Sequence, residues 1–362
     1  MTSVAPDLRT LVTEITKWAE TKRMFGDARL DTGFDEVMIR DAFSGVGLQA
    51  ATKILQDRHI AYLGINEAEN SIQIFTQKGL RIRDRDLLEK ARLGDIRLVF
   101  RNGSQLSSGN IPPISSPVPP YHLHNQHYTC GSSTSIANEP SAGTIGCLVM
   151  DSSRELFALS NNHVFAMNNY ADLGIPVIAP GQIDIAANAL DPFVLGHLAG
   201  AMPIIGGNPQ IVNASANIDA AVIKIRDASL ISSMQRDCYD TPNQVGDLKA
   251  GIPVEKVGRT TGRTRGQVVS HHVTPQPIKC NIHKYGTFKV AYFTEFFGVV
   301  GDNGAFSTSG DSGSLVTTID DHGQRLAVGL VFAGNDDLSF VLSLDKVLDH
   351  FGLQMVGGHN IQ

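Results

Sequence analysis

Charged residues are scarce in this chain of 362 residues, since only 18% of them are Asp, Glu, Lys or Arg, whereas an average soluble domain has about 25%. Basic residues are the scarcer kind: 30 Lys and Arg stand against 36 Asp and Glu, for a formal net charge of −6. Proteins that bind nucleic acid through its phosphates rely on an excess of basic residues. The composition therefore argues against a nucleic-acid partner.

Long apolar runs are also missing, because no stretch reaches the roughly 18 uninterrupted apolar residues that a membrane-spanning helix needs. The first 20 residues include Asp7, Glu14 and Glu20, where a secretory signal peptide has a continuous apolar segment. The four cysteines are too few for a disulfide framework in so long a chain. We therefore expect a cytoplasmic protein with no membrane partner, whose cysteines are mostly buried thiols.

Glycine, by contrast, is abundant, with 35 residues among 362, which exceeds the usual ~7%. Low charge together with many glycines is typical of short strands joined by tight turns. The first expectation for the core of this protein is therefore a mainly β structure.

One long segment, 102–138, contains no charged residue and carries five prolines before residue 121. Such Pro/Ser-rich stretches are typical of extended linkers or of straps that lie on a surface. We therefore place the boundary there and expect three parts: an N-terminal α/β domain (1–101), a linker or strap (102–129) and a second domain (130–362).

The N-terminal part mixes helical and strand patterns. Asp7 is a candidate cap for a helix in which apolar residues recur at helical spacing up to Trp18, and a second helix is expected at 48–56. Strands are expected at 61–65, 71–76 and 95–100. No catalytic constellation is found here, so we expect a regulatory or assembly role, with a homo-oligomer as one form of assembly.

After residue 130 the pattern changes to short β-prone runs bounded by Gly, Asn, Asp or Pro, followed by one helix at 344–351. This pattern fits a sandwich or barrel. The expected strands are 144–150, 156–159, 220–225, 267–270, 287–293, 314–318 and 326–332.

Three short segments of this part carry residues with a chemical role. His163 lies in the run LSNNHVF, Asp219 opens the apolar run IDAAVIKI, and Ser312 lies in the glycine-bracketed run TSGDSGS. A hydroxyl nucleophile, an imidazole base and a carboxylate that orients the imidazole together perform serine acyl transfer. The glycines allow a sharp turn that aims the N–H groups of Gly310 and Ser312 at a developing oxyanion.

In this order, each beside a β-prone run, these segments resemble those of the chymotrypsin-like (trypsin-like) serine peptidases. The phrases TCGSS, SAGTIGCLV, LSNNHV, GRTTG and GLVFAG extend the resemblance to the bacterial branch that carries an N-terminal α/β domain and is related to plant Narrow-leaf proteins. The resemblance implies two antiparallel β-barrels with the active site between them. It also implies that His163, Asp219 and Ser312 are the catalytic residues and that GRTTG lies in a solvated hairpin.

Substrate contacts are carried over from the same resemblance. Counting back from the nucleophile places the residue that sets primary specificity near Phe306, and the substrate-binding edge strand corresponds to Phe332, Ala333 and Gly334. Two phenylalanines at these positions imply a narrow or apolar primary pocket, or one that needs rearrangement.

The motif around Ser312 departs from the family pattern in two ways. Ser314 replaces the second glycine of GDSGG, a change that we expect to be tolerated because serine is small. In zymogen-type members a freed N-terminus pairs with the carboxylate at Asp311, so here Asp311 must be satisfied by other groups.

Two loose groups of metal-binding residue types need separate consideration. One comprises His122, His124, His127 and Cys130, and the other comprises His271, His272, Cys280 and His283. Neither spacing matches a standard zinc finger or ribbon. We therefore expect no metal site and no other cofactor.

The leading hypothesis is a serine endopeptidase, a hydrolase acting on a protein or peptide substrate and regulated by its N-terminal domain. The alternative is a catalytically silent binding or scaffold protein that keeps the peptidase fold; an esterase with the same three residues is a third possibility.

Overall fold

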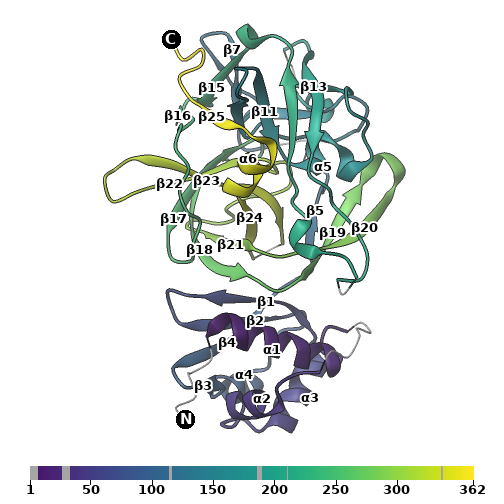
Figure 1. The fold of residues 1–362 in the computed structure, drawn as a ribbon, viewed down its shortest axis with the longest axis vertical. Coiled ribbons are helices and arrows are strands. Elements are labelled where there is room, and N and C mark those ends of the chain that lie inside the picture. The colour runs from purple at the N-terminus through teal and green to yellow at the C-terminus, as the bar shows by residue number, and fades with distance from the viewer. Residues whose placement is uncertain (1–6, 27–32, 114–115, 186–189, 210, 336) are drawn as a thin grey trace.

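A computed structural model describes residues 7–26, 33–113, 116–185, 190–209, 211–335 and 337–362. A small α/β domain lies at one end of the molecule, and a larger β-rich part with two barrels lies above it (Figure 1). The predicted fold class, mainly β with two antiparallel barrels and a small N-terminal α/β domain, is confirmed.

The N-terminal domain packs helices against one small sheet. Its helices are α1 (Leu8–Thr21), α2 (Glu36–Ala42), α3 (Leu48–Arg58) and α4 (Ile82–Leu88), and its strands are β1 (Ile60–Asn66), β2 (Ser71–Thr76), β3 (Arg92–Leu93) and β4 (Ile96–Asn102). The strand order is β1-β2-β4-β3, with β2 and β4 parallel.

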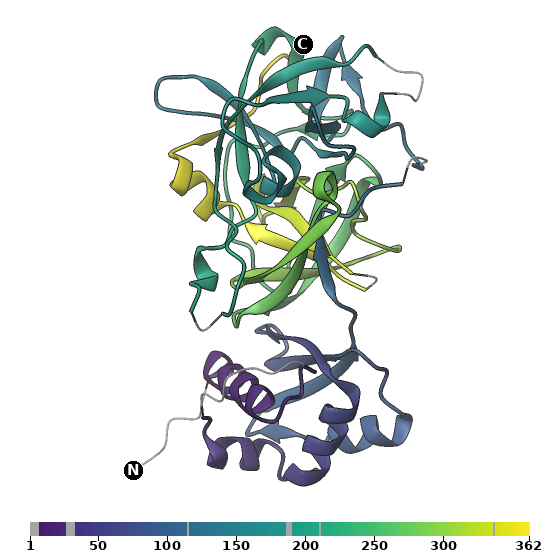
Figure 2. The same ribbon diagram turned by 90° about the vertical axis from the view of Figure 1, so that its right-hand side faces the viewer.

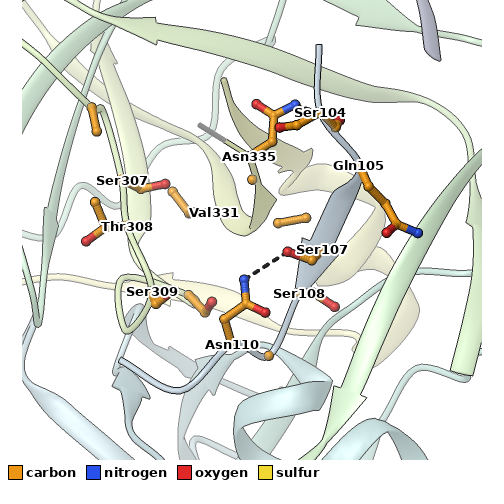
Figure 3. A pocket seen from close by; sticks show the side chains of 15 residues that line it. Ser104, Gln105, Ser107, Ser108, Asn110, Ser307, Thr308, Ser309, Val331 and Asn335 are labelled. Carbon is orange, nitrogen blue, oxygen red and sulfur yellow. Dashed lines mark hydrogen bonds between the residues drawn. The ribbon is translucent and has the colours of Figure 1, made fainter. Parts of the chain in front are cut away.

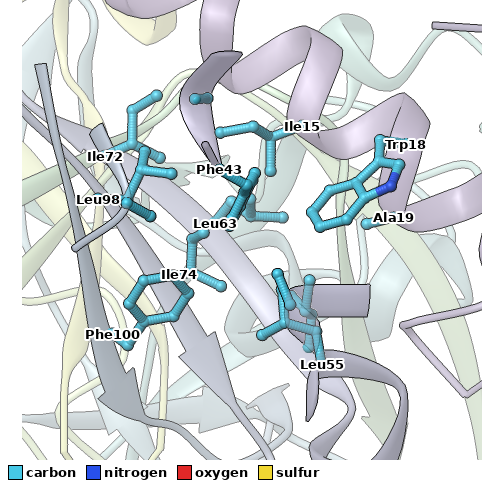
Figure 4. Packing of buried hydrophobic residues seen from close by; sticks show 14 of the residues in the cluster. Ile15, Trp18, Ala19, Phe43, Leu55, Leu63, Ile72, Ile74, Leu98 and Phe100 are labelled. Atoms are coloured by element: carbon cyan, nitrogen blue, oxygen red, sulfur yellow. The ribbon is translucent and has the colours of Figure 1, made fainter. Parts of the chain in front are cut away.

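Local sequence signals explain α1 and the core beneath it. Asp7 caps the helix by accepting a hydrogen bond from the Thr10 amide at 2.7 Å, as its predicted role requires. Ile15 and Trp18 recur on one face and are fully buried, and Trp18 lies against Phe43 of the helical layer, with ring centroids 4.8 Å apart. Figure 4 shows these side chains meeting Leu63 and the other apolar residues of the sheet.

The second barrel of the larger part is a closed ring of six strands. Each strand pairs with the next around the ring β17-β18-β21-β24-β23-β22, and β22 returns to β17. The strands are β17 (Pro253–Gly258), β18 (Gly262–His272), β21 (Phe296–Gly301), β22 (Leu315–Ile319), β23 (Arg325–Gly334) and β24 (Ser339–Ser343). A hairpin of β19 (Gln276–Ile282) and β20 (Thr287–Phe293) is inserted between β18 and β21.

The first barrel is a curled sheet with the order β25-β10-β11-β14-β13-β12-β8-β9. Its strands are β8 (Ser133–Ile136), β9 (Gly143–Thr144), β10 (Cys147–Met150), β11 (Leu156–Ser160), β12 (Pro176–Ala179), β13 (Phe193–Ala201), β14 (Ala221–Ile225) and β25 (Gln354–Val356). Since β9 leads into β10 along the chain, the sheet curls back on itself.

Smaller elements complete the larger part. A four-stranded sheet contains β16 (Tyr239–Asp240), β15 (Ile231–Gln235), β7 (His127–Cys130) and β6 (Leu123–His124). Two short helices are α5 (Asn162–Phe165) and α6 (Asp345–Phe351). Within the described residues, no helix combines the length and the apolar character needed to cross a membrane. Three of the four cysteines are buried and all four are free thiols, as expected.

The segment after β4 does not run free between the two parts. Figure 2 shows the chain leaving the N-terminal domain and rising into the barrels. There it forms β5 (Leu106–Ser108), which lies between β19 and β23 in the largest sheet. Farther along, Pro113 accepts a hydrogen bond from Arg259 at 2.9 Å. Residues 104–113 are only a part of the segment that was expected to be a linker or strap (102–129), and from here on the name strap refers to 104–113 alone.

The N-terminal domain contacts the second barrel through β1 and β18, with Ile65 opposite His271. Polar contacts also join the surfaces: among them, His271 lies 3.2 Å from the Glu67 carboxylate, and Arg9 lies 2.9 Å from Glu295. His272 beside them is fully buried, and its Nδ1 lies 2.7 Å from the carbonyl oxygen of Leu63.

His272 predicts a pH dependence of stability. Burial lowers its pKa from 6.5 to about 3, so between these values the unfolded chain binds a proton that the folded protein does not. The contribution of His272 to the free energy of unfolding is therefore complete above pH 6.5 and is lost as the pH falls towards 3. From pH 7 to pH 5 the free energy of unfolding should fall by about 2 kcal/mol. Urea unfolding of the parent chain and His272→Gln at both pH values measures it.

The matched control is His322→Gln, which removes a histidine from an exposed turn. We expect the control to retain the pH dependence of the parent and His272→Gln to lose about 2 kcal/mol of it. An unchanged pH dependence in His272→Gln would contradict the assignment.

Candidate active site

His163 is placed by the end of β11, where the chain turns into the short helix α5. The side chain of Asn161 fixes this turn by donating a hydrogen bond to the carbonyl oxygen of Asp219 at 2.7 Å. The His163 side chain is only 5% exposed to solvent.

Asp219 lies just before β14, which pairs with β11 so that Ser160 is opposite Ala221. This antiparallel register brings the end of one strand and the start of the other together. The Asp219 carboxylate is 2.6 Å from His163 Nδ1 and also accepts the His163 backbone N–H at 3.0 Å. A carboxylate at Nδ1 favours the tautomer whose Nε2 is a free proton acceptor.

Ser312 lies in the loop between β21 and β22, in a turn shaped by two glycines. Gly310 and Gly313 have φ values of +98° and +90°, a region that residues with a Cβ atom avoid. The carbonyl oxygen of Ser312 accepts a hydrogen bond from the Thr144 amide at 2.8 Å. The turn of the second barrel is thereby attached to β9 of the first barrel.

A common cavity connects these residues. His163 and Ser312 both line a small cleft, together with Glu139, Asn281 and His283. Burial raises the pKa of the Glu139 carboxyl, and the nearby His283 opposes this effect. The structure therefore brings His163, Asp219 and the Gly310–Ser312 turn together between the barrels.

Asp311 is satisfied by groups of the GRTTG hairpin. Its carboxylate accepts the backbone N–H of Thr260 at 2.8 Å and of Thr308 at 3.0 Å, and it lies 3.3 Å from the Lys256 ammonium. Burial lowers the pKa of Lys256, and the Asp311 charge opposes this effect. Lys256 and Arg259 are fully buried, whereas Arg263 and Arg265 of β18 are exposed. The hairpin is therefore solvated as expected at Arg263 and Arg265 and buried at Arg259.

The same turn accommodates the departure at Ser314. Its buried hydroxyl donates a hydrogen bond to the Asp311 carbonyl oxygen at 2.6 Å. Ser314 therefore adds a hydrogen bond that stabilises the turn carrying Ser312.

Replacing Lys256 by methionine tests the role of this ion pair. The substitution leaves the Asp311 carboxylate buried without its cation, and breaking such a pair costs about 3–5 kcal/mol. Urea unfolding at pH 7 measures the loss, and the exposed Lys249 gives the matched control Lys249→Met. A loss below about 1 kcal/mol, the value of an exposed pair, would show that backbone N–H groups alone stabilise Asp311.

The predicted substrate-binding residues divide into two groups. Ala333 and Gly334 line a cavity of about 560 Å³ beside Ser312. Phe332 is fully buried among Phe293 and Phe296, and Phe306 is buried in the core of the second barrel. Neither phenylalanine lines this cavity, because both side chains point into the apolar core.

The cavity differs from the narrow or apolar pocket that the two phenylalanines implied. Its lining is rich in hydroxyl and amide side chains, as Figure 3 shows. The polar residues labelled in the figure are Ser104, Gln105, Ser107, Ser108, Asn110, Ser307, Thr308, Ser309 and Asn335.

Five of these residues belong to the strap and were not predicted as site residues. The available signal was the absence of charge between 102 and 138, which indicated an extended segment without indicating where it lies. Asn335 was also missed; its amide donates to the carbonyl oxygen of Ser104 at 3.2 Å.

Of the two loose His/Cys groups, His283 lines the cleft with His163 and Ser312, and other members make separate contacts. His124 and His127 contact the carbonyl oxygens of Ile361 and Ser229 at 3.0 and 2.7 Å. Burial raises the pKa of the Cys280 thiol to about 12. In the part of the chain that the structure describes, no three His, Cys, Asp or Glu side chains are arranged to hold a metal ion.

Comparisons with known proteins give one curated relative and several solved structures. No family model matches the chain. Protein NARROW LEAF 1 of Oryza sativa subsp. japonica is 26% identical over 227 residues, which cover 56% of this chain and 36% of that protein. The matched part is thus about a third of the relative's length, and the predicted relation to plant Narrow-leaf proteins is confirmed.

Solved structures with a similar fold include three proteases. Thermobifida fusca Protease A has a TM-score of 0.42 and 18% identity, covering 64% of this chain and 98% of that chain. A glutamic acid specific serine protease has a TM-score of 0.41 and 14% identity, covering 63% and 100%. Cellulomonas bogoriensis chymotrypsin has a TM-score of 0.38 and 16% identity, covering 63% and 97%.

Proposed function

We propose that this chain is a serine endopeptidase whose access to substrate is controlled by its N-terminal domain. The observation that carries the proposal is the arrangement around one cleft. Ser312 and His163 line the cleft, and the Asp219 carboxylate lies 2.6 Å from Nδ1 of His163. A hydroxyl, a base and an orienting carboxylate in this order are the requirements of serine acyl transfer.

In the proposed mechanism, the Ser312 oxygen attacks the scissile carbonyl carbon while Nε2 of His163 accepts the hydroxyl proton. Asp219 holds the imidazole and stabilises its cation. The carbonyl oxygen becomes an oxyanion, to which the N–H groups of Gly310 and Ser312 donate hydrogen bonds. His163 then gives its proton to the leaving amine, and an acyl-enzyme ester forms on Ser312.

Hydrolysis of the ester repeats these steps with water. His163 accepts a proton from water as the water oxygen attacks the ester carbonyl, and it returns the proton to Ser312 as the C–O bond breaks. Each step uses groups of this chain.

A peptide substrate is favoured over a simple ester by the edge of β23. Ala333 and Gly334 at the end of β23 line the cavity beside Ser312. A strand edge offers backbone hydrogen bonds to an extended peptide, which a small ester does not use.

The experiment is digestion of an unbiased peptide library, with the new termini identified by mass spectrometry. We expect cleavage within peptides by the chain that keeps Ser312 and none by Ser312→Ala. Hydrolysis of small esters with no peptide cleavage would favour the esterase. No turnover of either substrate class, by a chain whose cleft is open to substrate, would favour the silent scaffold.

A further inference from the structure

We propose that the strap occupies the substrate groove of this chain as an internal peptide, so that the protein is latent until the strap is withdrawn. The inference rests on the proposed function and specifies how the same site is regulated.

The first observation is the strand pairing of β5 along the edge of β23. The pairing of β22 with β23 ends near Val331, where the Val331 amide donates to the Ser314 carbonyl oxygen at 3.1 Å. Beyond this point β5 lies on that edge, with Ser107 opposite Gly334 in antiparallel register. An extended peptide that adds to a sheet edge uses the same backbone groups. The strap therefore takes the place of such a peptide.

The opposite side of β5 is also paired. Residues Leu106 to Ser108 run parallel to Ile278–Cys280 of β19, so β5 fills a slot between two strands. The Leu106 side chain is 2% exposed and belongs to the apolar cluster that contains Phe332. Burial of an apolar side chain stabilises the segment that carries it, so Leu106 anchors the strap in this slot.

The second observation is the path of the strap past the candidate catalytic residues. Gly109 and Asn110 line both the cleft shared by His163 and Ser312 and the larger cavity beside Ser312. A Cβ atom on Gly109 would lie 3.5 Å from Cδ2 of His163. Pro112, farther along, lies beside Gly310. The strap thus passes beside His163 and the turn that carries Ser312.

The strap is nevertheless held in an unproductive geometry. The Gly109 carbonyl oxygen accepts a hydrogen bond from Nε2 of His283, and Gly109 has a φ of +66°. The neighbouring Ser108 carbonyl oxygen is bound by the Asn281 amide at 3.2 Å. A carbonyl bound to His283 is turned to a partner outside the Gly310–Ser312 turn, which explains how the strap stays intact beside a nucleophile.

The third observation is the direct attachment of the strap to the N-terminal domain. β4 ends at Asn102, so only Gly103 separates it from Ser104. The Asn335 side chain, from the loop after β23, donates both to the Ser104 carbonyl oxygen at 3.2 Å and to the Tyr62 hydroxyl of β1 at 3.0 Å. Movement of the N-terminal domain away from the barrel would pull on the strap at its first residue.

The test compares two proline substitutions in the full chain. Ser107→Pro removes the N–H of the central residue of β5, and proline is poorly tolerated in a paired strand. Ile111→Pro is the matched control, because Ile111 lies in the strap outside β5 and its side chain is 55% exposed. Cleavage of tetrapeptide and longer substrates is measured beside labelling by a small fluorophosphonate that needs no groove.

We expect Ser107→Pro to cleave the extended peptides roughly tenfold faster or more than the parent chain, and Ile111→Pro to match the parent. The labelling rate at Ser312 should change less than the peptide rate. Leu106→Ala, which removes buried contacts of the strap without changing its backbone, should act in the same direction if Ser107→Pro fails to fold.

Failure of the two proposals gives different results. If the parent chain already cleaves extended peptides as fast as a folded Ser107→Pro chain, the strap does not block the groove and the inference is wrong. If no chain is labelled at Ser312, the endopeptidase proposal is wrong. The inference is then decided by binding: a synthetic peptide of residues 102–113 should bind to Ser107→Pro in calorimetry and not to the parent, and equal binding to both would overturn it.

Discussion

Replacing Ser312 by alanine is expected to lower peptide turnover by a factor of about 10⁵–10⁶, because the nucleophile of the proposed mechanism is lost and the remaining groups act only on bound substrate. Ser312 is half-buried at the rim of two cavities, so removal of its hydroxyl changes little packing. The melting temperature should therefore stay within about 2 °C of the parent value.

The rates are measured in the Ser107→Pro background as well as in the parent chain, so that a low basal rate does not hide the effect. Ser153→Ala, in the exposed turn between β10 and β11, is the matched control and should keep the full rate. Ser312→Ala with more than a tenth of the parent rate would exclude Ser312 as the nucleophile.

Asp219→Asn is expected to lower turnover by about 10⁴. The amide of asparagine presents an N–H donor where His163 Nδ1 now faces a carboxylate oxygen at 2.6 Å. The imidazole would then carry its proton on Nε2, which leaves no base for Ser312. The loss should appear in kcat rather than in KM, since Asp219 is fully buried and lies behind the imidazole.

The control for this substitution is Asp227→Asn, which changes an exposed carboxylate that caps a short helical turn. Its turnover should equal that of the parent. A loss of less than tenfold in a folded Asp219→Asn chain would mean that His163 is oriented by another group.

Secondary structure was predictable where the signals were local. The helix after Asp7 begins where the cap predicts and runs over Leu8–Thr21, and the strand expected at 71–76 is β2. The hairpin β19–β20 was only half predicted, because the polar and apolar alternation of β19 is interrupted by Pro277. Local patterns also gave no indication that β5 is a strand, since three residues are too few for a periodicity.

Sequence motifs identified His163, Asp219 and Ser312 as candidates. The proximity of these residues in the fold depends on strand pairing between distant segments. The register of Ser160 against Ala221 joins residues about 60 positions apart, which no local pattern encodes. The expectation that Phe332 lines the substrate pocket is wrong for a related reason. Successive strand residues point to opposite faces, so Ala333 lines the cavity while Phe332 next to it enters the core.

Labelling of the full chain by a small fluorophosphonate, with the modified residue identified by peptide mass spectrometry, measures whether Ser312 is an activated nucleophile. Because the probe forms a covalent bond only with an activated serine, the account predicts one phosphonyl group per chain, on Ser312. Labelling should be lost in Ser312→Ala and strongly reduced in His163→Ala. No labelling of Ser312 in either the parent or the folded Ser107→Pro chain, or equal labelling of His163→Ala, would contradict the account.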